Sequence, residues 1–591
     1  MEQLFNGIPG VVMQLRKLST RALTASMLCA VTWAQTEVGP SIRTDSVAGF
    51  KAANETSIAV SEANPLVVVG SWNDYRDGNV RLGVGLSTDG GATWSDSVIR
   101  PDMAFQAPLE GDPMTAFCNR TGTLWVGGLS FGGNGGIFVA RKDPGDAAFQ
   151  APVMARISGS VDKGWMAAGA APGMPDQTQL YVAYNEGLIT SSDMGATWSA
   201  PASLGTGLGF LPKVGPAGEL YIGYWDTSGA SDTHRIIRSF DGGATLLPPV
   251  LVAQRMDVWG ADGSRFPGDF RVVPLQGLAV DPNTGDVYFV YPDTTDVAAG
   301  NSNVDIYFTR SVDQGATWSV PVVINDDASR PADQFFPWIE VDRTGRLHML
   351  FFNTRHNQQD DAAFQGLVDA YYSYSDDGGG SWMETRLTGS SFSSINDGFG
   401  GGFLGDYLGL ATAGGRALPF YCASSAATST DVFVHSITDG PATTYCMGLA
   451  CPCGNDDPAA GCGNKGFDDS VATGGTLTAS GSNGLAANDI VIVVGGVRAG
   501  ASGLIFAGPN RIAPPFGDGL RCVGGATFRY PVRASNGAGQ ITYGPNFVTS
   551  VPRASVMTVG STWNYQGWFR DNAGPCGSGF NTSNAISVTW H

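Results

Sequence analysis

Acidic, tyrosine and arginine residues recur at two places in this sequence: before one apolar strand-like run and after the next. Asp74, Tyr75 and Arg76 follow the apolar run 66–72, whereas Asp406 and Tyr407 precede another such run. Carboxyl groups can serve as general acids and bases, and a guanidinium fork binds carboxylate oxygens bidentately. If such residues met at one place, they would suit binding or hydrolysis of a carbohydrate, or binding of a peptide.

The segments 74–76 and 354–356 also have a simpler structural interpretation. Asp–Arg pairs and backbone hydrogen bonds close many surface loops, and exposed ion pairs of this kind contribute little to stability. The five histidines are scattered, so the sequence predicts no metal site and no Ser-His-Asp motif. The glycine-rich run 398–405 lacks the lysine and following helix of a phosphate loop, so no cofactor is predicted.

The elements that must position these residues are indicated by an eight-residue repeat, Ser-x-Asp-x-Gly-x-Thr-Trp. Ser and Asp side chains bond to nearby backbone groups, Gly permits a positive φ angle, and Trp offers an apolar face to bury. The repeat therefore predicts a tight turn between two antiparallel strands, with a structural rather than a catalytic aspartate. Its five copies begin at Ser87, Ser191, Ser239, Ser311 and Ser375, with Leu246 replacing Trp in the third and Ser381 replacing Thr in the fifth.

This repeat resembles the Asp-box, or bacterial neuraminidase repeat, and residues 50–440 resemble Asp-box β-propellers of the sialidase superfamily. The resemblance implies an all-β fold of four-stranded blades, with the boxes on the outer strand pair of each blade, away from any active site. Seven repeat units can be counted, although well-studied sialidases have six, so both numbers remain open. In a propeller, the starts of the innermost strands and the loops after the second strands open on one face around the axis. The inner-strand starts include Glu55, Asp112, Lys163 and Asp406.

The resemblance also implies an activity, exo-α-sialidase-type glycoside hydrolysis. Sialidases clamp a substrate carboxylate with three arginines and use a tyrosine nucleophile with an aspartate acid. Transferred to this sequence, the substrate-binding residues would be Arg76, Arg355, Arg271 and His356, the nucleophile Tyr407 (or Tyr75), and the acid Asp74, Asp112 or Asp406. The alternative is a non-catalytic propeller that binds carbohydrate or protein at the cell surface. The expected partners are glycans or glycoconjugates and cell-surface components.

Charge and the N-terminal segment bear on location. The formal net charge of −19 disfavours nucleic acid and anionic membrane surfaces as partners. Basic residues at 16, 17 and 21 precede an apolar stretch and then small residues, which predicts a signal peptide over 1–34, with Met13 as an alternative start. No later segment resembles a transmembrane helix. We therefore expect an exported protein, either secreted or held at the cell surface.

The cysteines predict a stapled C-terminal region. Without Cys29, which falls in the signal segment, eight cysteines remain, an even number that fits an oxidising compartment. Six fall after residue 440, and sequence alone does not choose among their possible pairings. We expect Cys118 and Cys422 to be buried free thiols. The predicted organisation is a propeller over 35–440, a Cys/Gly-rich linker over 441–470 and a small disulfide-stapled β-sandwich over 471–591.

Overall fold

The computed structural model contains β-strands and no helix in the part of the chain that it describes. None of these residues accordingly forms a helix long and apolar enough to cross a membrane. The predicted signal segment lies outside the described residues. Those residues are 36–46, 52–62, 64–100, 109–132, 134–256, 271–294, 303–327, 332–357, 366–399, 402–413, 415–426, 429–439, 442–457, 460–465, 473–481, 483–485, 488–549 and 556–590.

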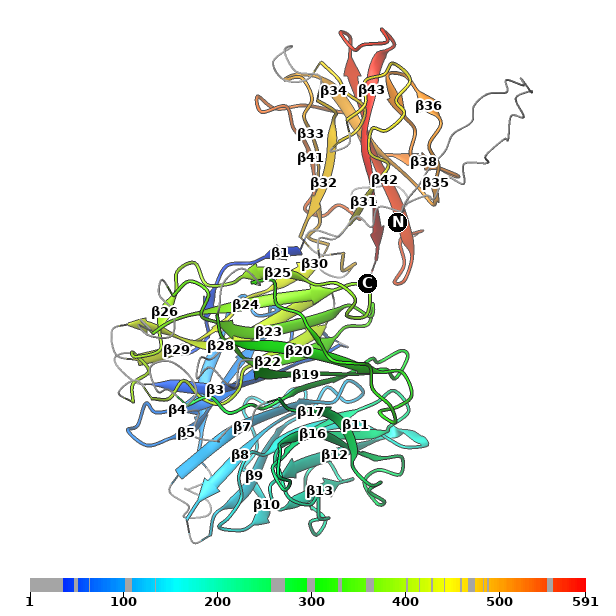
Figure 1. Cartoon of the computed structure of the whole chain (residues 1–591). Helices are drawn as coiled ribbons and strands as arrows, with labels where there is room; N and C mark the ends of the chain where they lie inside the picture. The colour runs from blue at the N-terminus through cyan, green and yellow to red at the C-terminus, as the bar shows by residue number, and fades with distance from the viewer. Residues whose placement is uncertain are drawn as a thin grey trace, which may run out of the picture.

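Seven antiparallel sheets follow one another along the first three quarters of the chain and form the blades of a β-propeller (Figure 1). In each blade, consecutive strands pair with one another from the axis outwards. Blades one to three contain β3 (Ala53–Val60), β4 (Val68–Asp74), β5 (Arg81–Ser87) and β6 (Ser95–Ile99); β7 (Leu109–Phe117), β8 (Leu124–Phe131), β9 (Gly136–Lys142) and β10 (Val153–Ile157); and β11 (Trp165–Ala171), β12 (Met174–Tyr184) and β13 (Gly187–Ser191).

Blades four to six repeat this order, and apolar residues from neighbouring blades pack together between the sheets. The seven sheets decide between the two blade numbers that the sequence left open. These three blades contain β14 (Leu208–Val214), β15 (Leu220–Asp226), β16 (Thr233–Ser239) and β17 (Val250–Gln254); β18 (Gly277–Val280), β19 (Val287–Thr294), β20 (Val304–Ser311) and β21 (Val322–Val323); and β22 (Gln334–Val341), β23 (Leu347–Asn353), β24 (Leu367–Ser375), β25 (Met383–Arg386) and β26 (Phe392–Ser393).

The seventh blade joins the two ends of the propeller. Its strands β27 (Gly409–Ala413), β28 (Arg416–Ala426) and β29 (Ser429–Val434) are extended by β2 (Ile42–Arg43), which pairs with β29. Strand β1 (Thr36–Val38) pairs with β30 (Ile437–Asp439), which in turn pairs with β28. Because strands from both ends share one sheet, backbone hydrogen bonds close the ring of blades.

β-Bulges interrupt the innermost strands near their starts. In β3 the register shifts between Asn54 and Ser57, and in β7 between Gly111 and Met114. Glu55 and Asp112 lie inside these bulges with φ angles of 53° and 49°, and Lys163, just before β11, has 48°. Bulges re-aim side chains and are frequent beside functional sites. In blades one and two the bulges carry charged residues, and in blade three a charged residue stands just before the innermost strand.

The repeated turn forms as its chemistry predicts, and each copy begins at the last residue of the third strand of a blade. In the fourth copy, the Ser311 hydroxyl donates to Asp313 Oδ1 (2.7 Å) and accepts the Gly315 N–H (2.8 Å). The Asp313 carboxylate also accepts the Thr317 hydroxyl (2.6 Å) and the Thr317 N–H (2.8 Å), and the bonds from Thr317 and Ser311 lower the pKa of Asp313 to about 2. The aspartate is thus committed to its own turn.

Replacing Ser311 by alanine should lower the free energy of unfolding by about 1–2 kcal/mol, because the buried Gly315 N–H would lose its acceptor. Denaturant titration measures this loss. Val312→Ala, at an exposed position of the same turn, is the matched control. Equal denaturation midpoints for Ser311→Ala and Val312→Ala would show that the Ser311 hydroxyl does not stabilise the turn.

The C-terminal region forms a separate set of sheets with its own core, drawn above the propeller in Figure 1. Its disulfides are Cys446–Cys522, Cys451–Cys462 and Cys453–Cys576, which settles the pairing that sequence left open. Cys118 and Cys422 are buried and free, as expected. The strands are β31 (Thr443–Tyr445), β32 (Thr476–Ser480), β33 (Val491–Gly495), β34 (Ser502–Gly508), β35 (Asn510–Arg511), β36 (Pro515–Phe516), β37 (Gly519–Leu520), β38 (Val523–Gly524), β39 (Phe528–Arg529), β40 (Arg533–Ala534), β41 (Ile541–Tyr543), β42 (Thr562–Asp571) and β43 (Gly579–Thr589).

Reduction should destabilise this C-terminal module and leave the propeller unchanged. All three disulfides lie in the module, and loss of one such bond from a small domain costs about 2–5 kcal/mol. Calorimetry with and without reductant should show one unfolding transition move to lower temperature while a second stays in place. Equal shifts of both transitions would contradict this assignment.

Candidate functional site

Six side chains from five blades meet at the start of the innermost strands, and we call them the hub cluster. Glu55 and Asp112 come from the bulges of β3 and β7, and Lys163 stands just before β11. Arg271 precedes β18, and Asp406 and Tyr407 precede β27. The bulges and strand entries bring residues that are far apart in sequence to one end of the propeller axis.

Lys163 lies at the centre of the hub cluster and contacts all three of its carboxylates. Its Nζ atom lies 3.4 Å from Glu55 Oε1 and 3.3 Å from Asp112 Oδ1, and it forms an ion pair with Asp406. The Lys163 backbone N–H also donates to Asp112 Oδ2 (2.8 Å). Lysine is almost never buried without such partners, and Lys163 is 7% exposed. These carboxylates therefore hold its charge inside the protein.

Asp406 is held ionised by two cations. Arg271 Nε donates to Asp406 Oδ1 (2.7 Å), and Arg271 Nη2 and Lys163 both contact Oδ2. Burial favours the neutral acid, but the two positive charges and their hydrogen bonds outweigh it and lower the pKa of Asp406. This side chain therefore provides a fully buried carboxylate whose charge is maintained.

Glu55 has the opposite electrostatic situation. Burial raises its pKa well above the usual range, and the negative charges of Asp112 and Asp406 raise it further, although Lys163 opposes them. Asn73 Nδ2 donates to Glu55 Oε2 (2.9 Å), which fixes the orientation of the carboxyl group. Two carboxyl groups whose surroundings move their pKa values apart are the usual sign of an acid–base pair.

Tyr407 lies within the hub cluster but is poorly placed to ionise. It is 4% exposed, and burial together with the charges of Glu55, Asp112 and Asp406 raises the pKa of its phenol well above the normal value. Its ring packs edge-on against Trp165, with centroids 5.2 Å apart. Burial and the nearby Glu55 likewise raise the pKa of Tyr75, to about 12. Both tyrosines therefore remain neutral phenols at physiological pH.

Aromatic rings line the outer side of the cluster. Tyr75 packs edge-on against Phe399, with centroids 4.9 Å apart, and the Arg271 guanidinium lies 4.7 Å from the Phe403 centroid. Asp397 holds this segment through the N–H groups of Phe399 (2.7 Å) and Phe403 (2.6 Å). The glycine-rich run thus contributes the rim of the cluster, and Phe399 is 41% exposed there.

The structure brings together four of the eight predicted site residues and places the other four elsewhere. Asp112, Asp406, Tyr407 and Arg271 belong to the hub cluster. Asp74 and Arg76 form an ion pair (2.6 Å) within blade one, where Arg76 also reaches Asp96 (2.5 Å).

The two predicted residues of blade six bind partners in that blade and in the segment just before it. Arg355 pairs with Glu384 of β25 and with Asp326 (2.6 Å), and His356 Nε2 lies 2.7 Å from the Tyr371 hydroxyl. The three arginines of the expected clamp thus occupy three separate ion-pair groups. The loops after the second strands direct Arg76 and Arg355 towards the outer strands of their blades, where Asp96 and Glu384 pair with them.

Glu55 and Lys163 were the residues for which sequence offered no chemical role. Both stand at inner-strand starts, and their position in the repeat was the available signal. Their roles depend on the bulges and on Asp406, which lies 243 positions from Lys163 in the sequence. No local motif reports such a contact.

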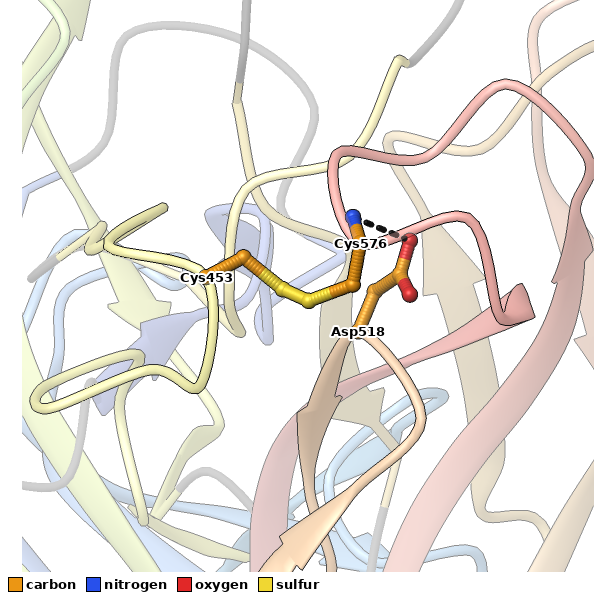
Figure 2. A group of neighbouring side chains, drawn as sticks. All are labelled: Cys453, Asp518 and Cys576. Carbon is orange, nitrogen blue, oxygen red and sulfur yellow. Dashed lines mark hydrogen bonds between the residues drawn. A yellow bond between two sulfur atoms is a disulfide. The ribbon is translucent and has the colours of Figure 1, made fainter.

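Atoms of the types that bind metal ions lie close together in the C-terminal module, where Asp518 approaches Cys453 and Cys576 (Figure 2). The two cysteines form a disulfide, so their sulfur atoms are not free thiolates. Asp518 instead accepts the backbone N–H groups of Cys576 (3.3 Å) and Ser578 (3.1 Å). This group stabilises the loop between β42 and β43.

Comparisons with known proteins give likenesses of fold. No protein-family model and no curated protein matches the sequence. Solved structures that resemble the chain include a protein of unknown function from Dyadobacter fermentans DSM 18053, with 12% identity, a TM-score of 0.40 and coverage of 68% of this chain and 99% of that one. An alpha-L-arabinanase of Penicillium chrysogenum complexed with arabinobiose has 14% identity, a TM-score of 0.35 and coverage of 68% and 98%. The Hadza microbial sialidase Hz136 has 17% identity, a TM-score of 0.34 and coverage of 65% of each chain.

Proposed function

We propose that the hub cluster binds a glycan and hydrolyses one of its glycosidic bonds. The observation that carries this proposal is the opposite displacement of two carboxyl pKa values around one lysine, upwards for Glu55 and downwards for Asp406. Most glycosidases need one protonated carboxyl group and one carboxylate beside the scissile bond. The three disulfides of the module fit an exported protein that meets glycans outside the cytoplasm.

The two carboxyl groups would divide the reaction between them. Glu55 would donate its proton to the leaving glycosidic oxygen as that bond breaks. Asp406 would either attack the anomeric carbon or take a proton from an attacking water, which are the retaining and inverting versions of this chemistry. Lys163 and Arg271 would keep Asp406 ionised, and Asp112 would help to hold Lys163 in place.

The charges of the site favour a neutral glycan over a sialoside. A sialic acid carboxylate needs guanidinium groups that can pair with it. Arg271 is already bound to Asp406, whereas Arg76 and Arg355 each bind two carboxylates outside the hub cluster. The neutral phenol of Tyr407 also lacks the activation that a tyrosine nucleophile requires. We therefore propose a two-carboxylate mechanism in place of the exo-α-sialidase mechanism.

A panel of fluorogenic glycosides tests both parts of the proposal. We expect release of fluorophore from at least one neutral glycoside, and none from the α-sialoside. Turnover of the sialoside alone would overturn the substrate class but support hydrolysis at the hub. Absence of turnover with every glycoside, together with no release of reducing ends from neutral polysaccharides, would overturn hydrolysis.

Non-catalytic glycan binding at the same place is the second candidate function. It is favoured by the exposed Phe399 ring beside Tyr75, because aromatic faces at a pocket rim are common contacts for ligands. A glycan array separates the two functions. Binding that is lost in Phe399→Ala, in a protein that cleaves no glycoside, would assign the hub cluster to recognition alone.

A further inference from the structure

The other half of the propeller axis contains a cavity, which we call the channel chamber. Its volume is about 470 Å³, and residues of all seven innermost strands line it, on the side where these strands end. Cavities of this size are typical of sites for small ligands. Trp165 lines the chamber and also packs against Tyr407, so it lies between the chamber and the hub cluster.

The walls of the channel chamber are unequal. On one side the lining includes the small residues Ala59, Ala168 and Ala170, together with larger ones such as Met114 and Met166. On the other side Lys213 of β14 and Trp338 and Glu340 of β22 project into the space. The small residues leave room in the chamber beside the Trp338 indole ring, which lies next to the ion pair of Lys213 and Glu340.

The polar groups of the projecting wall are arranged around that ring. Trp338 Nε1 donates to Glu340 Oε1 (3.1 Å), Lys213 pairs with the same carboxylate, and Lys213 Nζ lies 5.7 Å from the indole centroid of Trp338. The indole N–H of Trp165, which is 3% exposed, has no hydrogen-bond partner among the described residues. A buried donor without a partner is costly, and a ligand in the chamber would supply the missing acceptor.

At the mouth of the chamber, charges are again matched. Arg343 donates to Glu62 Oε2 through Nε (2.9 Å), and Asn119 Nδ2 donates to the same oxygen (3.0 Å). Arg343 is largely exposed, so this contact is weakened by solvent and can open. An anion entering here would meet Glu62 and Glu340, and a cation would meet Arg343 and Lys213.

We infer that the channel chamber is a second ligand site, which takes a neutral mono- or disaccharide. A sugar ring presents C–H groups that pack on an aromatic face and hydroxyls that both donate and accept hydrogen bonds. Trp338 supplies the face, Glu340 the acceptor, and Lys213 and Trp165 the donors. Charges of both signs, at the mouth and in the wall of the chamber, disfavour strongly charged ligands. The polar groups of the wall disfavour purely apolar ones. This site is independent of the reaction proposed for the hub cluster.

Calorimetric titration of the full chain tests the inference, with glucose, galactose, N-acetylglucosamine, lactose and cellobiose as probes. Each sugar is titrated into the unaltered protein and into Tyr75→Ala, a variant that changes the rim of the hub cluster but not the channel chamber. We expect at least one sugar to bind both proteins with the same affinity. Adding Glu340→Gln should weaken it at least about tenfold, because that change removes a charged acceptor.

Trp338→Leu provides a second test, since it removes the aromatic face and keeps an apolar side chain. It should also weaken binding, and melting curves show whether each variant remains folded. The inference is overturned if none of the five sugars binds, if binding is lost in Tyr75→Ala, or if Glu340→Gln in a folded protein leaves the affinity unchanged.

Discussion

Replacing Asp406 by asparagine should lower kcat/KM for the cleaved glycoside by about a thousandfold, the scale expected when an essential acid or base is removed. The substitution keeps the size of the side chain but removes the negative charge that Arg271 and Lys163 hold in place. KM should change much less than kcat, because the carboxylate is needed mainly as charge develops at the anomeric carbon. Steady-state kinetics with the glycoside found in the panel measure both constants.

Asp226→Asn is the matched control for this variant. Asp226 ends the second strand of blade four, is also buried, and binds Arg235 (2.7 Å) and Ser228 within its own blade. It should retain the activity of the unaltered protein. Equal losses in the two variants would point to a general effect on the propeller, and full activity in Asp406→Asn would remove this carboxylate from the reaction.

Replacing Lys163 by methionine should be the most destabilising single change in the hub cluster. Methionine fills similar volume but leaves Glu55, Asp112 and Asp406 without their shared cation. Removing one partner from a buried ion pair costs about 3–5 kcal/mol. Denaturant unfolding at neutral pH measures this loss, and Lys213→Met, which removes a partly exposed lysine from the channel chamber, should cost far less.

The deficit of Lys163→Met should depend on pH. In the unaltered protein the pKa of Asp406 is lowered by folding, so its contribution to stability is present above its unfolded pKa and is lost as pH falls through its folded pKa. Glu55 has a raised folded pKa and behaves in the opposite way, favouring the fold when protonated. Without Lys163 the carboxyl groups can become neutral only by protonation. The difference in the free energy of unfolding between the unaltered protein and Lys163→Met should therefore become smaller as pH falls through the acid range. A difference that does not change with pH would contradict this electrostatic account.

The fold could be predicted from sequence because its signals are local. Ser311, Asp313 and Gly315 lie within one turn, and their hydrogen bonds follow from their spacing alone. Five such turns, with the apolar runs between them, indicate hairpins and blades. The strand pair β2–β29 that closes the ring joins Ile42 to Val434, and this pairing has no local signal.

The site was harder to predict because its contacts are distant in sequence. The inner-strand positions of Asp112, Asp406 and Tyr407 follow from the repeat. Arg76 and Arg355 have suitable chemistry but find carboxylates on the outer strands of their own blades, namely Asp96 and Glu384. Residue type and position in the repeat do not predict which neighbouring carboxylate a long arginine side chain will pair with.

The pH dependence of kcat/KM tests most directly whether Glu55 is the acid and Asp406 the carboxylate of a glycosidase. The account predicts a bell-shaped profile whose alkaline limb lies above the normal carboxyl range, because activity is lost as Glu55 ionises with its raised pKa. Glu55→Gln should have low residual activity and lack that limb, while Asp226→Asn keeps it. A profile without an alkaline limb, or a limb that persists in Glu55→Gln, would contradict the account.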